Sequence, residues 1–293
     1  MIKVESVTKY YGDVCSLDEV TLQIPDGSIF GLIGSNGSGK STLLRAMSGI
    51  FAVEEGRILF DGCNIWENTE QKAKLVYLSD EPFFLPHSSI REMRDLYRSL
   101  YPTFSDAKFE QLLKVLGLPE HRKINTFSKG MQKQAAFHLT LCCRPDVMIL
   151  DEPVDGLDPV MRRQVMSMVL SDVAERGTTV LVSSHNLREL EDVCDHVGIL
   201  NRGEMLLEKS LTDMQGSVQK LQLVGEIPEG LEVLHESASG RLKTLIVRGS
   251  AVEIATKAEA AKPAYFDVLP LSLEEIFIYE LGGVNDEVKN IIL

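Results

Sequence analysis

The sequence contains little basic charge, no long apolar run and no spaced cysteine pair. Among its 293 residues, 43 Asp and Glu outnumber 30 Lys and Arg, which gives a net charge of -13. A chain with this balance repels the phosphate backbone of nucleic acids unless basic residues gather locally, and no run of Lys and Arg is present. We therefore expect no nucleic acid among its partners.

Membrane-spanning and disulfide-forming patterns are also missing. The longest stretch without a charged residue, Gly27 to Gly39, is glycine-rich and falls far short of the roughly 18 apolar residues of a membrane-spanning helix. Met1 to Glu5 alternates like a strand and lacks the apolar core of a signal peptide. The five cysteines include no C-x-x-C pair, so no disulfide framework or zinc site is indicated. These absences favour a cytoplasmic protein with reduced, mostly buried thiols.

The order of apolar segments predicts two domains. Over residues 1–208, strands alternate with helical segments, which indicates an α/β domain around a largely parallel sheet. Between about residues 89 and 141 the pattern is helical and is broken by proline and glycine, which predicts a helical insert. Residues 209–293 show short alternating strands near Val218–Val224 and Leu242–Val247, which predict a small α+β domain.

Several elements of these domains can be located more closely. In the second domain we expect a turn at Ser237–Gly240 and helices at Ala251–Ala261 and Ser272–Leu281. We place the domain boundary between Lys209 and Gln219. An apolar face of the last helix would contain Leu273, Ile276, Phe277 and Leu281. Strands that are apolar throughout, as expected where helices cover both faces of a sheet, are Ile29–Ile33, Val147–Leu150 and Thr178–Val182.

A glycine-rich loop follows the first of these apolar strands. Gly34 to Ser41 fits the pattern G-x-x-x-x-G-K-[ST] and precedes a helix-compatible segment, as this phosphate-binding motif requires. Its glycines let backbone N–H groups point at phosphate oxygens, Lys40 would reach the β- and γ-phosphates, and Ser41 would bind Mg²⁺. A plain glycine turn would not explain the Lys40–Ser41 pair. The residues expected at the nucleotide are Gly34, Ser35, Asn36, Gly37, Ser38, Gly39, Lys40, Ser41 and Thr42.

A second element of a hydrolytic site follows the strand Val147–Leu150. This strand delivers two carboxylates, Asp151 and Glu152, at its carboxyl end. We expect Asp151 to hold Mg²⁺ through water and Glu152 to accept a proton from the attacking water. An acidic pair after a strand is often only a polar loop, but its presence beside a phosphate loop favours catalysis.

Three further segments make the chain resemble the nucleotide-binding subunit of an ABC transporter. They are Phe127–Gln132, which precedes the Asp151–Glu152 strand, Val154–Asp158, which follows it, and Ser183–His185, which closes the next apolar strand. The resemblance spans Tyr11 to His185, nearly all of the first domain, and as an ordered set these segments are very specific. The resemblance implies ATP and Mg²⁺ as ligands and a P-loop nucleoside triphosphatase fold of the ABC type.

The resemblance also implies a partner subunit. In this family two subunits pack head to tail, and each ATP lies between the glycine loop of one and the signature segment of the other. Ser128, Gly130 and Gln132 would form that signature here, while Lys129 stands where many members have glycine. A hydroxyl, a glycine and a helix start suit a γ-phosphate. Read alone, the segment would be an ordinary helix cap.

Three other residues match functional positions of the family. His185 corresponds to the histidine that contacts the γ-phosphate and orders the attacking water. Tyr11 corresponds to the aromatic residue that stacks on adenine, with Tyr10 beside it as a rival and a role in the core as the alternative. Asp158 corresponds to a residue that contacts the opposite subunit, and it can also cap a helix that begins at Pro159.

One position departs from the family pattern. Where members usually have glutamine in a tyrosine-leucine-proline-glutamine run, this sequence reads Tyr77-Leu78-Ser79-Asp80. A carboxylate is a better ligand than an amide for a hard divalent cation, so we expect Asp80 to contact Mg²⁺. The alternative is that Asp80 points to solvent or toward a permease.

These features predict an ATPase subunit of an ABC transporter, similar to those of bacterial exporters. It would drive export through a separate membrane permease at the inner face of the cell membrane. The expected catalytic residues are Glu152, His185 and Lys40. The segment Glu81–Ile90 opens the helical insert, and its aromatic and apolar side chains would face the permease or form the core of the insert.

Other ABC-type ATPases form the alternatives. One that acts on DNA needs a long coiled coil between the glycine loop and the signature, and Lys40 and Ser128 are too close in sequence to allow one. A translation factor would carry two cassettes, whereas this sequence has one. A non-hydrolytic nucleotide sensor would not need Glu152 and His185. A soluble ATPase that acts on DNA or another non-transport target is the main rival.

Overall fold

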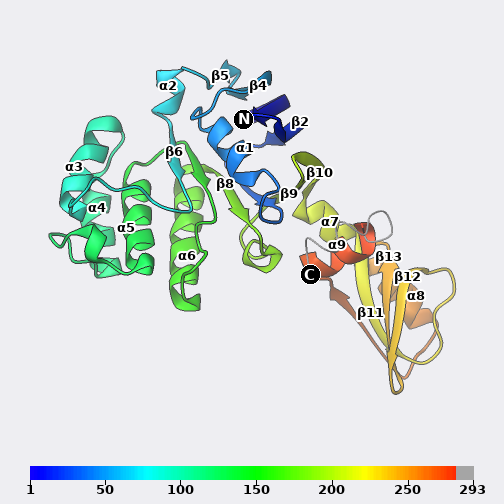
Figure 1. The fold of residues 1–293 in the computed structure, drawn as a ribbon. Helices are drawn as coiled ribbons and strands as arrows, with labels where there is room; N and C mark the ends of the chain where they lie inside the picture. Colours follow the sequence, from blue (N-terminus) through cyan, green and yellow to red (C-terminus); the bar gives the residue numbers. More distant parts are fainter. Residues whose placement is uncertain (282–293) are drawn as a thin grey trace. The chain divides into compact units, whose positions relative to one another are not determined.

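The structure, a computed structural model, describes residues 1–281 apart from the side chains of residues 215–217, 273, 277, 280 and 281. The chain divides into two compact units, each of which is described by itself (Figure 1). The first contains residues 1–185 and 196–208. The second contains residues 186–195 and the chain from Lys209 onward. The sequence patterns did not predict that residues 186–195 group with the second unit.

A six-stranded sheet forms the centre of the first unit. Four of its neighbouring pairs are parallel, namely β3 with β8, β3 with β9, β6 with β7 and β7 with β8. All five residues of β3 are buried, as expected for a strand without a polar face. The predicted α/β class is therefore confirmed. In spatial order the strands are β10 (Glu204–Ser210), β9 (His196–Asn201), β3 (Ile29–Ile33), β8 (Thr179–Ser184), β7 (Val147–Leu150) and β6 (Leu75–Leu78).

A second sheet in the first unit is antiparallel, and the sequence analysis did not predict it beside the largely parallel sheet. Its strands β1 and β2 pair from Ile2 opposite Ile24 to Tyr11 opposite Val14. Alternation of apolar and polar residues predicts such strands, but it does not reveal the direction in which they pair. In spatial order the strands are β2 (Val14–Ile24), β1 (Ile2–Tyr11), β4 (Glu55–Phe60) and β5 (Cys63–Asn64).

Capping residues set the limits of the helices in the first unit. Ser89 forms a capping box with Glu92 at the start of α3. Asp158 caps α6, which begins at Pro159 and ends at Arg176, and Gly177 caps its end with a φ of 67°. Helices α3, α4 and α5 form one group (Figure 1). The helices are α1 (Lys40–Met47), α2 (Thr69–Lys72), α3 (Ile90–Leu100), α4 (Asp106–Leu116), α5 (Lys129–Cys142), α6 (Pro159–Arg176) and the 3-10 turn η1 (Ile124–Thr126).

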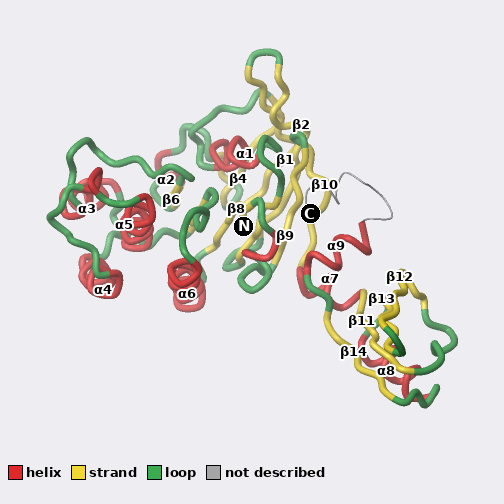
Figure 2. Tube along the Cα trace, turned by 60° about the horizontal axis from the view of Figure 1, so that its bottom comes forward, coloured by secondary structure: helices red, strands yellow, loops and turns green. Residues whose placement is uncertain are grey.

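The second unit contains a four-stranded antiparallel sheet with helix α8 packed against it (Figure 2). Its core joins Leu221, Leu223 and Leu245 of the sheet with Ile254 and Ala258 of α8. Strand β11 has the predicted bounds. In contrast, β12 and β14 were not predicted. The elements are η2 (Leu187–Glu189), α7 (Leu211–Ser217), β11 (Val218–Val224), β12 (Glu232–Ser239), β13 (Leu242–Arg248), α8 (Ala251–Ala260), β14 (Tyr265–Pro270) and α9 (Leu273–Leu281), with the sheet in the order β12, β13, β11, β14.

Helix α9 is held by ion pairs as well as by apolar contact. Of the predicted apolar face, Ile276 is buried, while the side chains of Leu273, Phe277 and Leu281 lie outside the description. Arg188 of η2 lies 2.7 Å from Glu274 of α9. The α9 helix is therefore tied to the segment that directly follows His185 in the chain.

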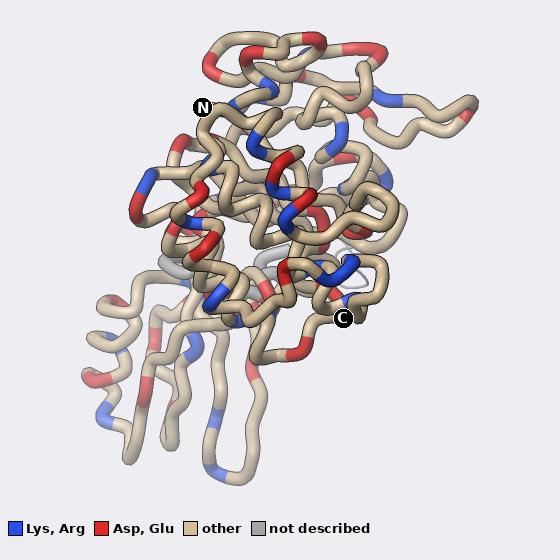
Figure 3. The backbone as a smooth tube through the Cα atoms, turned by 90° about the vertical axis from the view of Figure 1, so that its left-hand side faces the viewer, with Lys and Arg blue, Asp and Glu red and all other residues tan. Residues whose placement is uncertain are grey.

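Charged residues and cysteines are spread over both units of the described chain. Acidic and basic residues are interspersed along the chain (Figure 3). Within residues 1–281, no helix is long and apolar enough to span a membrane. The five cysteines are free, and Cys142, Cys143 and Cys194 are buried, whereas Cys63 is exposed. Burial raises the pKa of Cys142 to about 12, which keeps its thiol protonated.

His138 of α5 is a fully buried histidine against α4. Its ring stacks on Phe109 with centroids 4.4 Å apart, and its Nε2 lies 2.9 Å from the Phe109 carbonyl oxygen. Burial lowers the pKa of His138 from 6.5 to about 4, because the charged ring would lose its hydration. The folded protein therefore holds this ring neutral until the solution is strongly acidic.

This lowered pKa predicts a loss of stability in acid. His138 takes up a proton near pH 6.5 when unfolded but only near pH 4 when folded, so its burial costs stability as the pH falls between these values. We expect wild type to lose about 2 kcal/mol more free energy of unfolding than His138→Gln between pH 7 and pH 5. Urea titrations at both pH values measure the difference, with His121→Gln at an exposed site as the control. Equal losses in all three proteins would contradict the expectation.

Candidate functional site

The carboxyl ends of four parallel strands meet at one edge of the six-stranded sheet. The glycine loop follows β3, Asp80 closely follows β6, Asp151 follows β7 and His185 follows β8. Residues that are distant in sequence thereby surround one cavity of about 330 Å³. Its lining residues are Ser16, Asn36, Gly37, Gly39, Lys40, Ser41, Thr42, Asp80, Glu152, Asp155 and His185.

Glycine is required in the loop for two different reasons. Gly39 has a φ of 105°, a conformation that disfavours residues with a side chain. At Gly34 a Cβ atom would collide with the carbonyl oxygen of Leu200 and the hydroxyl of Ser38. The loop can therefore wind closely against β9 and turn directly into α1, which begins at Lys40.

The Lys40 ammonium folds back over its own loop. Its Nζ donates hydrogen bonds to the carbonyl oxygens of Gly34, at 2.7 Å, and Ser35, at 3.2 Å. The same atom lies 3.3 Å from Glu152 Oε1. Because the Lys40 side chain is only 5% exposed, these contacts satisfy a charge that has little access to water.

Glu152 joins the predicted catalytic residues into one connected set. Besides its contact with Lys40, its Oε2 lies 2.8 Å from Nδ1 of His185. Glu152 is 16% exposed and His185 is 46% exposed, so the carboxylate lies deeper than the ring. The structure thus brings Lys40, Glu152 and His185 together, and the carboxylate can exchange a proton with a group inside the cavity.

Asp151 lies behind the cavity and is fully buried. Its Oδ2 accepts a hydrogen bond from the Tyr77 hydroxyl at 3.1 Å, and its Oδ1 accepts one from the Ser183 hydroxyl at 2.8 Å. Burial and the neighbouring Asp151 charge raise the pKa of Tyr77 to about 12, so Tyr77 stays protonated and remains a donor. Arg45 Nε in turn donates to the Tyr77 oxygen at 3.4 Å.

Sequence analysis missed three residues that support this site. Tyr77 and Ser183 lie within motifs that were noted only for their neighbours, and the available signal was a hydroxyl group within a strand that is otherwise mostly apolar. Lys133 of α5 donates to the carbonyl oxygens of Glu152, at 3.2 Å, and Asp155, at 2.6 Å. No pattern singled out Lys133, although it directly follows the signature segment Phe127–Gln132.

The donors for a metal ion are oxygen atoms, as Mg²⁺ prefers. Ser41 and Asp80 line the cavity, while Asp151 is placed behind it. Asp80 is exposed, and its Oδ1 accepts a hydrogen bond from the backbone N–H of Glu81 at 2.8 Å. Within residues 1–281 no group of three or more His, Cys, Asp or Glu forms a complete metal centre. The set fits an ion that also takes ligands from phosphate and water.

The signature residues form the start of a helix away from the cavity lining. Ser128 caps α5 by accepting a hydrogen bond from the Met131 N–H at 3.2 Å. Gln132 Nε2 donates to the carbonyl oxygens of Ile124 and Phe127, each at 3.3 Å. In the described part of the chain, Ser128, Gly130 and Gln132 are absent from the cavity lining. Their predicted contact with ATP stays a prediction.

Two other predicted residues are also outside the described cavity lining. Asp158 accepts hydrogen bonds from the N–H groups of Val160, at 3.0 Å, and Met161, at 3.1 Å, so the structure contains the helix cap. Tyr11 is 44% exposed and meets Phe51 edge to face with ring centroids 6.0 Å apart. Its stacking on adenine, and the intersubunit contact of Asp158, stay predictions.

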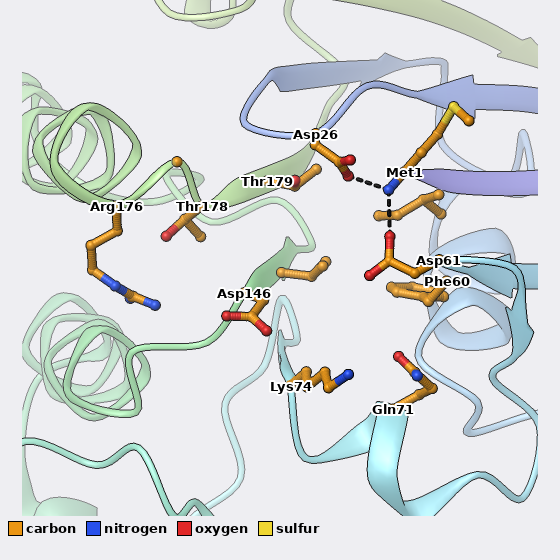
Figure 4. Close-up of a pocket in the computed structure, with 13 residues that line it drawn as sticks. Met1, Asp26, Phe60, Asp61, Gln71, Lys74, Asp146, Arg176, Thr178 and Thr179 are labelled. Carbon is orange, nitrogen blue, oxygen red and sulfur yellow. Dashed lines mark hydrogen bonds and ion pairs between the residues drawn. The ribbon is translucent and has the colours of Figure 1, made fainter.

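A second cavity of about 240 Å³ lies at the opposite ends of β7 and β8 (Figure 4). Its charged residues include Lys74, Asp146 and Arg176, and the Met1 ammonium pairs with Asp26 and, at 2.7 Å, with Asp61. Of the residues that the structure describes and the sequence marked as functional, none lines it. Ligands of open α/β sheets bind at the carboxyl ends of the strands, so the first cavity is the candidate site.

A strand, a glycine loop with Lys40 and Ser41, and a second strand that ends in Asp151 and Glu152 define a P-loop nucleoside triphosphatase. Comparison with known proteins assigns it to a family. A family model described as ABC transporter matches residues 17–155. The ABC transporter ATP-binding protein YtrB of Bacillus subtilis is 31% identical over 288 residues, which cover 97% of this chain and 99% of the relative.

Two further similarities agree with this match. The lantibiotic transport ATP-binding protein SrtF of Streptococcus pyogenes is 31% identical over 211 residues, covering 71% of this chain and 90% of the relative. A bacterial ABC transporter cassette solved as a dimer shares the fold, with a TM-score of 0.66, 24% identity and coverage of 72% of this chain and 99% of that chain. The chain belongs to the ABC transporter family of ATP-binding proteins and is an ATPase, as the sequence analysis predicted.

Proposed function

We propose that this chain is the ATPase subunit of an exporter, and that Glu152 is the base of the hydrolytic reaction. The observation that carries the proposal is the position of Glu152 beside the phosphate loop, 3.3 Å from Lys40 and 2.8 Å from His185. Similarity to a lantibiotic transport protein over 90% of that protein's length supports a role in export. The net charge of -13 disfavours the rival function on DNA.

The resting contacts suggest how the residues act when ATP enters. The γ-phosphate competes with Glu152 for Lys40, and transfer of the ammonium to phosphate frees the carboxylate. Glu152 then accepts a proton from the attacking water, while His185 holds that water and the γ-phosphate in line. Mg²⁺, held by Ser41 and Asp80 with Asp151 behind them, would neutralise charge on the phosphate oxygens.

A second subunit completes the site in this proposal. The helix start with Ser128 and Gly130 is separate from the cavity lining of its own chain, as far as the described residues extend. A head-to-tail partner would supply these groups to ATP, as the family resemblance implies. The fold shared with a dimeric cassette supports this arrangement.

The segment Glu81–Ile90 is the proposed contact with the permease. Phe83 is 75% exposed and Leu85 is 43% exposed, which favours a docking role over a role in the core of the insert. Through this contact the chain would act at the cytoplasmic face of the membrane. The cargo is selected by the permease and is not specified by this chain.

We also propose that residues 1–208 form the ATP-binding domain, with a helical insert at about 89–141, and that residues 209–293 form an accessory domain. The division of the described chain at Glu208 supports this boundary. Residues 186–195 belong to the second unit by their contacts, and Arg188 pairs with Glu274 there. The accessory domain therefore contacts residues 186–195, which directly follow His185 in the sequence.

Glu152→Gln tests the proposed base. The amide keeps the size of the side chain but cannot accept the proton, so we expect ATP binding to persist while hydrolysis falls by ~10² or more. Dimers with trapped ATP should accumulate. Steady-state turnover and ATP affinity are compared with those of Glu175→Gln, an exposed glutamate on α6. Near-normal turnover of Glu152→Gln would remove Glu152 from the mechanism.

Asp80→Gln tests the metal contact. A third carboxylate near Asp151 and Glu152 adds repulsion when no cation is present, so Mg²⁺ and ATP should depend on each other more strongly in wild type than in the variant. We expect substantial ATPase activity in Asp80→Gln and a weaker mutual dependence in both Asp80→Gln and Asp80→Ala. ATP affinity is measured across a Mg²⁺ titration, with Glu81→Gln as the control. Superimposable curves for wild type and both Asp80 variants would exclude the contact.

Removal of the accessory domain tests its role. A chain truncated after Glu208 keeps every residue of the cavity lining, so we expect its ATP affinity to match wild type. Turnover should change, because Arg188 loses Glu274 as a partner. Circular dichroism first establishes that the truncated chain is folded, and full-length Glu274→Ala serves as the matched variant. A folded truncation without ATP binding would contradict the proposed domain division.

A further inference from the structure

Glu152 has a backbone conformation that residues with a side chain rarely adopt. Its φ is 44°, in the left-handed region, although it is not glycine. Such a conformation persists only where surrounding groups hold it, and it often occurs at reactive positions. Two side chains hold it here, beside the Asp155 N–H, which donates to the Glu152 carbonyl oxygen at 3.3 Å. The Glu152 N–H donates to Ser183 Oγ at 2.9 Å, and the Glu152 carbonyl oxygen accepts from Lys133 Nζ at 3.2 Å.

The Ser183 hydroxyl makes hydrogen bonds to two successive residues, one as acceptor and one as donor. Its oxygen accepts the N–H of Glu152, and its proton goes to Oδ1 of Asp151 at 2.8 Å. Ser183 and Asp151 are both fully buried, so water does not compete for either bond. A hydroxyl has only one proton to donate, and Ser183 donates it to Asp151. Because the same oxygen accepts the Glu152 N–H, one side chain fixes Asp151 and Glu152 together.

The position of Ser183 in the sheet explains why it can make both bonds. It lies in β8, which pairs in parallel with β7, and Leu150 at the end of β7 is opposite Val182. The next residue of each strand extends beyond this last pair, so Ser183 faces the start of the loop that contains Asp151 and Glu152. The hydroxyl therefore continues the contact between the two strands past the end of the backbone ladder.

We propose that Ser183 is a positioning residue of the ATPase reaction. Its hydroxyl fixes the buried carboxylate of Asp151 and the left-handed backbone of Glu152 relative to each other, and this holds the Glu152 side chain toward Lys40 and His185. The proposal rests on the proposed role of Glu152 as the base. In the described chain Ser183 is outside the cavity lining, so it acts through these two residues and not on ATP directly.

Substitutions of Ser183 test the proposal through turnover. Residues that orient metal-ligating side chains typically contribute 10- to 100-fold to activity, and Ser183 would orient Asp151 in this way. Ser183→Ala should therefore lower kcat by about that factor and change ATP affinity by less than about twofold. Ser183→Thr keeps the hydroxyl and should restore most of the kcat. Ser183→Cys has a thiol, which is a weak donor and a weak acceptor, and should lie in between.

Thr179→Val provides the matched control. Thr179 lies at the other end of β8, is 4% exposed, and its hydroxyl accepts the N–H of Gly27 at 3.0 Å. The substitution removes a buried hydroxyl from the same strand without affecting the loop after β7. It should therefore reproduce any general loss of stability while leaving kcat near wild type.

Hydrogen exchange gives a readout that does not depend on activity. Because Ser183 accepts the Glu152 amide proton, that amide should exchange faster in Ser183→Ala than in wild type, and at the wild-type rate in Thr179→Val and Ser183→Thr. The measurement is made on the full chain without nucleotide, after thermal unfolding establishes that each variant is folded. An unchanged rate in Ser183→Ala would overturn the proposal.

Comparison with Glu152→Gln separates this proposal from the proposed function. If Glu152→Gln loses turnover and Ser183→Ala does not, Glu152 is the base but Ser183 does not position it. If Glu152→Gln retains turnover, the proposed role of Glu152 fails and with it the basis of this inference. The proposal predicts that both single variants lose turnover and that Ser183→Ala causes no further loss in a Glu152→Gln background. A full further loss in the double variant would contradict it.

Discussion

The parallel pairing of β3, β8, β7 and β6 is the constraint on which the rest of the site depends. Because neighbouring parallel strands end at the same edge of a sheet, the residues after each strand are brought together although they are distant in the chain. The buried, apolar strands leave only these ends for polar residues. Glycine at the end of β3, carboxylates at the end of β7 and histidine at the end of β8 therefore face one another, and the fold determines which chemistry can occur there.

Because these strand ends lie close together, the charged side chains of Lys40 and Glu152 pair with each other. Lys40 and Glu152 have little exposure, and either would be costly to leave unpaired in such a place. Lys40 is satisfied by loop carbonyl oxygens and by Glu152, and Glu152 also contacts His185. The carboxylate that we propose as the base is thus the ion-pair partner of Lys40 in this structure. Asp151, in contrast, has hydroxyl groups as partners, because Tyr77 and Ser183 each donate a hydrogen bond to its buried carboxylate.

Much of this arrangement could be predicted from sequence, because short motifs fix local conformation. The glycine loop, the strand before Asp151 and the Asp158 cap each follow from residues adjacent in the chain. The antiparallel sheet was missed because strand direction leaves no mark in an alternating pattern. Tyr77, Ser183 and Lys133 were missed for a related reason, since their partners lie on other strands or helices and are distant in sequence. Ser128 and Tyr11 could be assigned a role only from the family resemblance.

The most direct test is a structure of the wild-type chain with Mg²⁺ and a non-hydrolysable ATP analogue. The account predicts that Lys40 leaves Glu152, 3.3 Å away in the present structure, and contacts the phosphates, while Glu152 keeps its left-handed backbone and its bond to Ser183. It also predicts that the analogue lies in the cavity lined by Lys40, Ser41 and His185. Phosphates bound elsewhere, or a Lys40–Glu152 pair that stays intact beside bound phosphate, would contradict it.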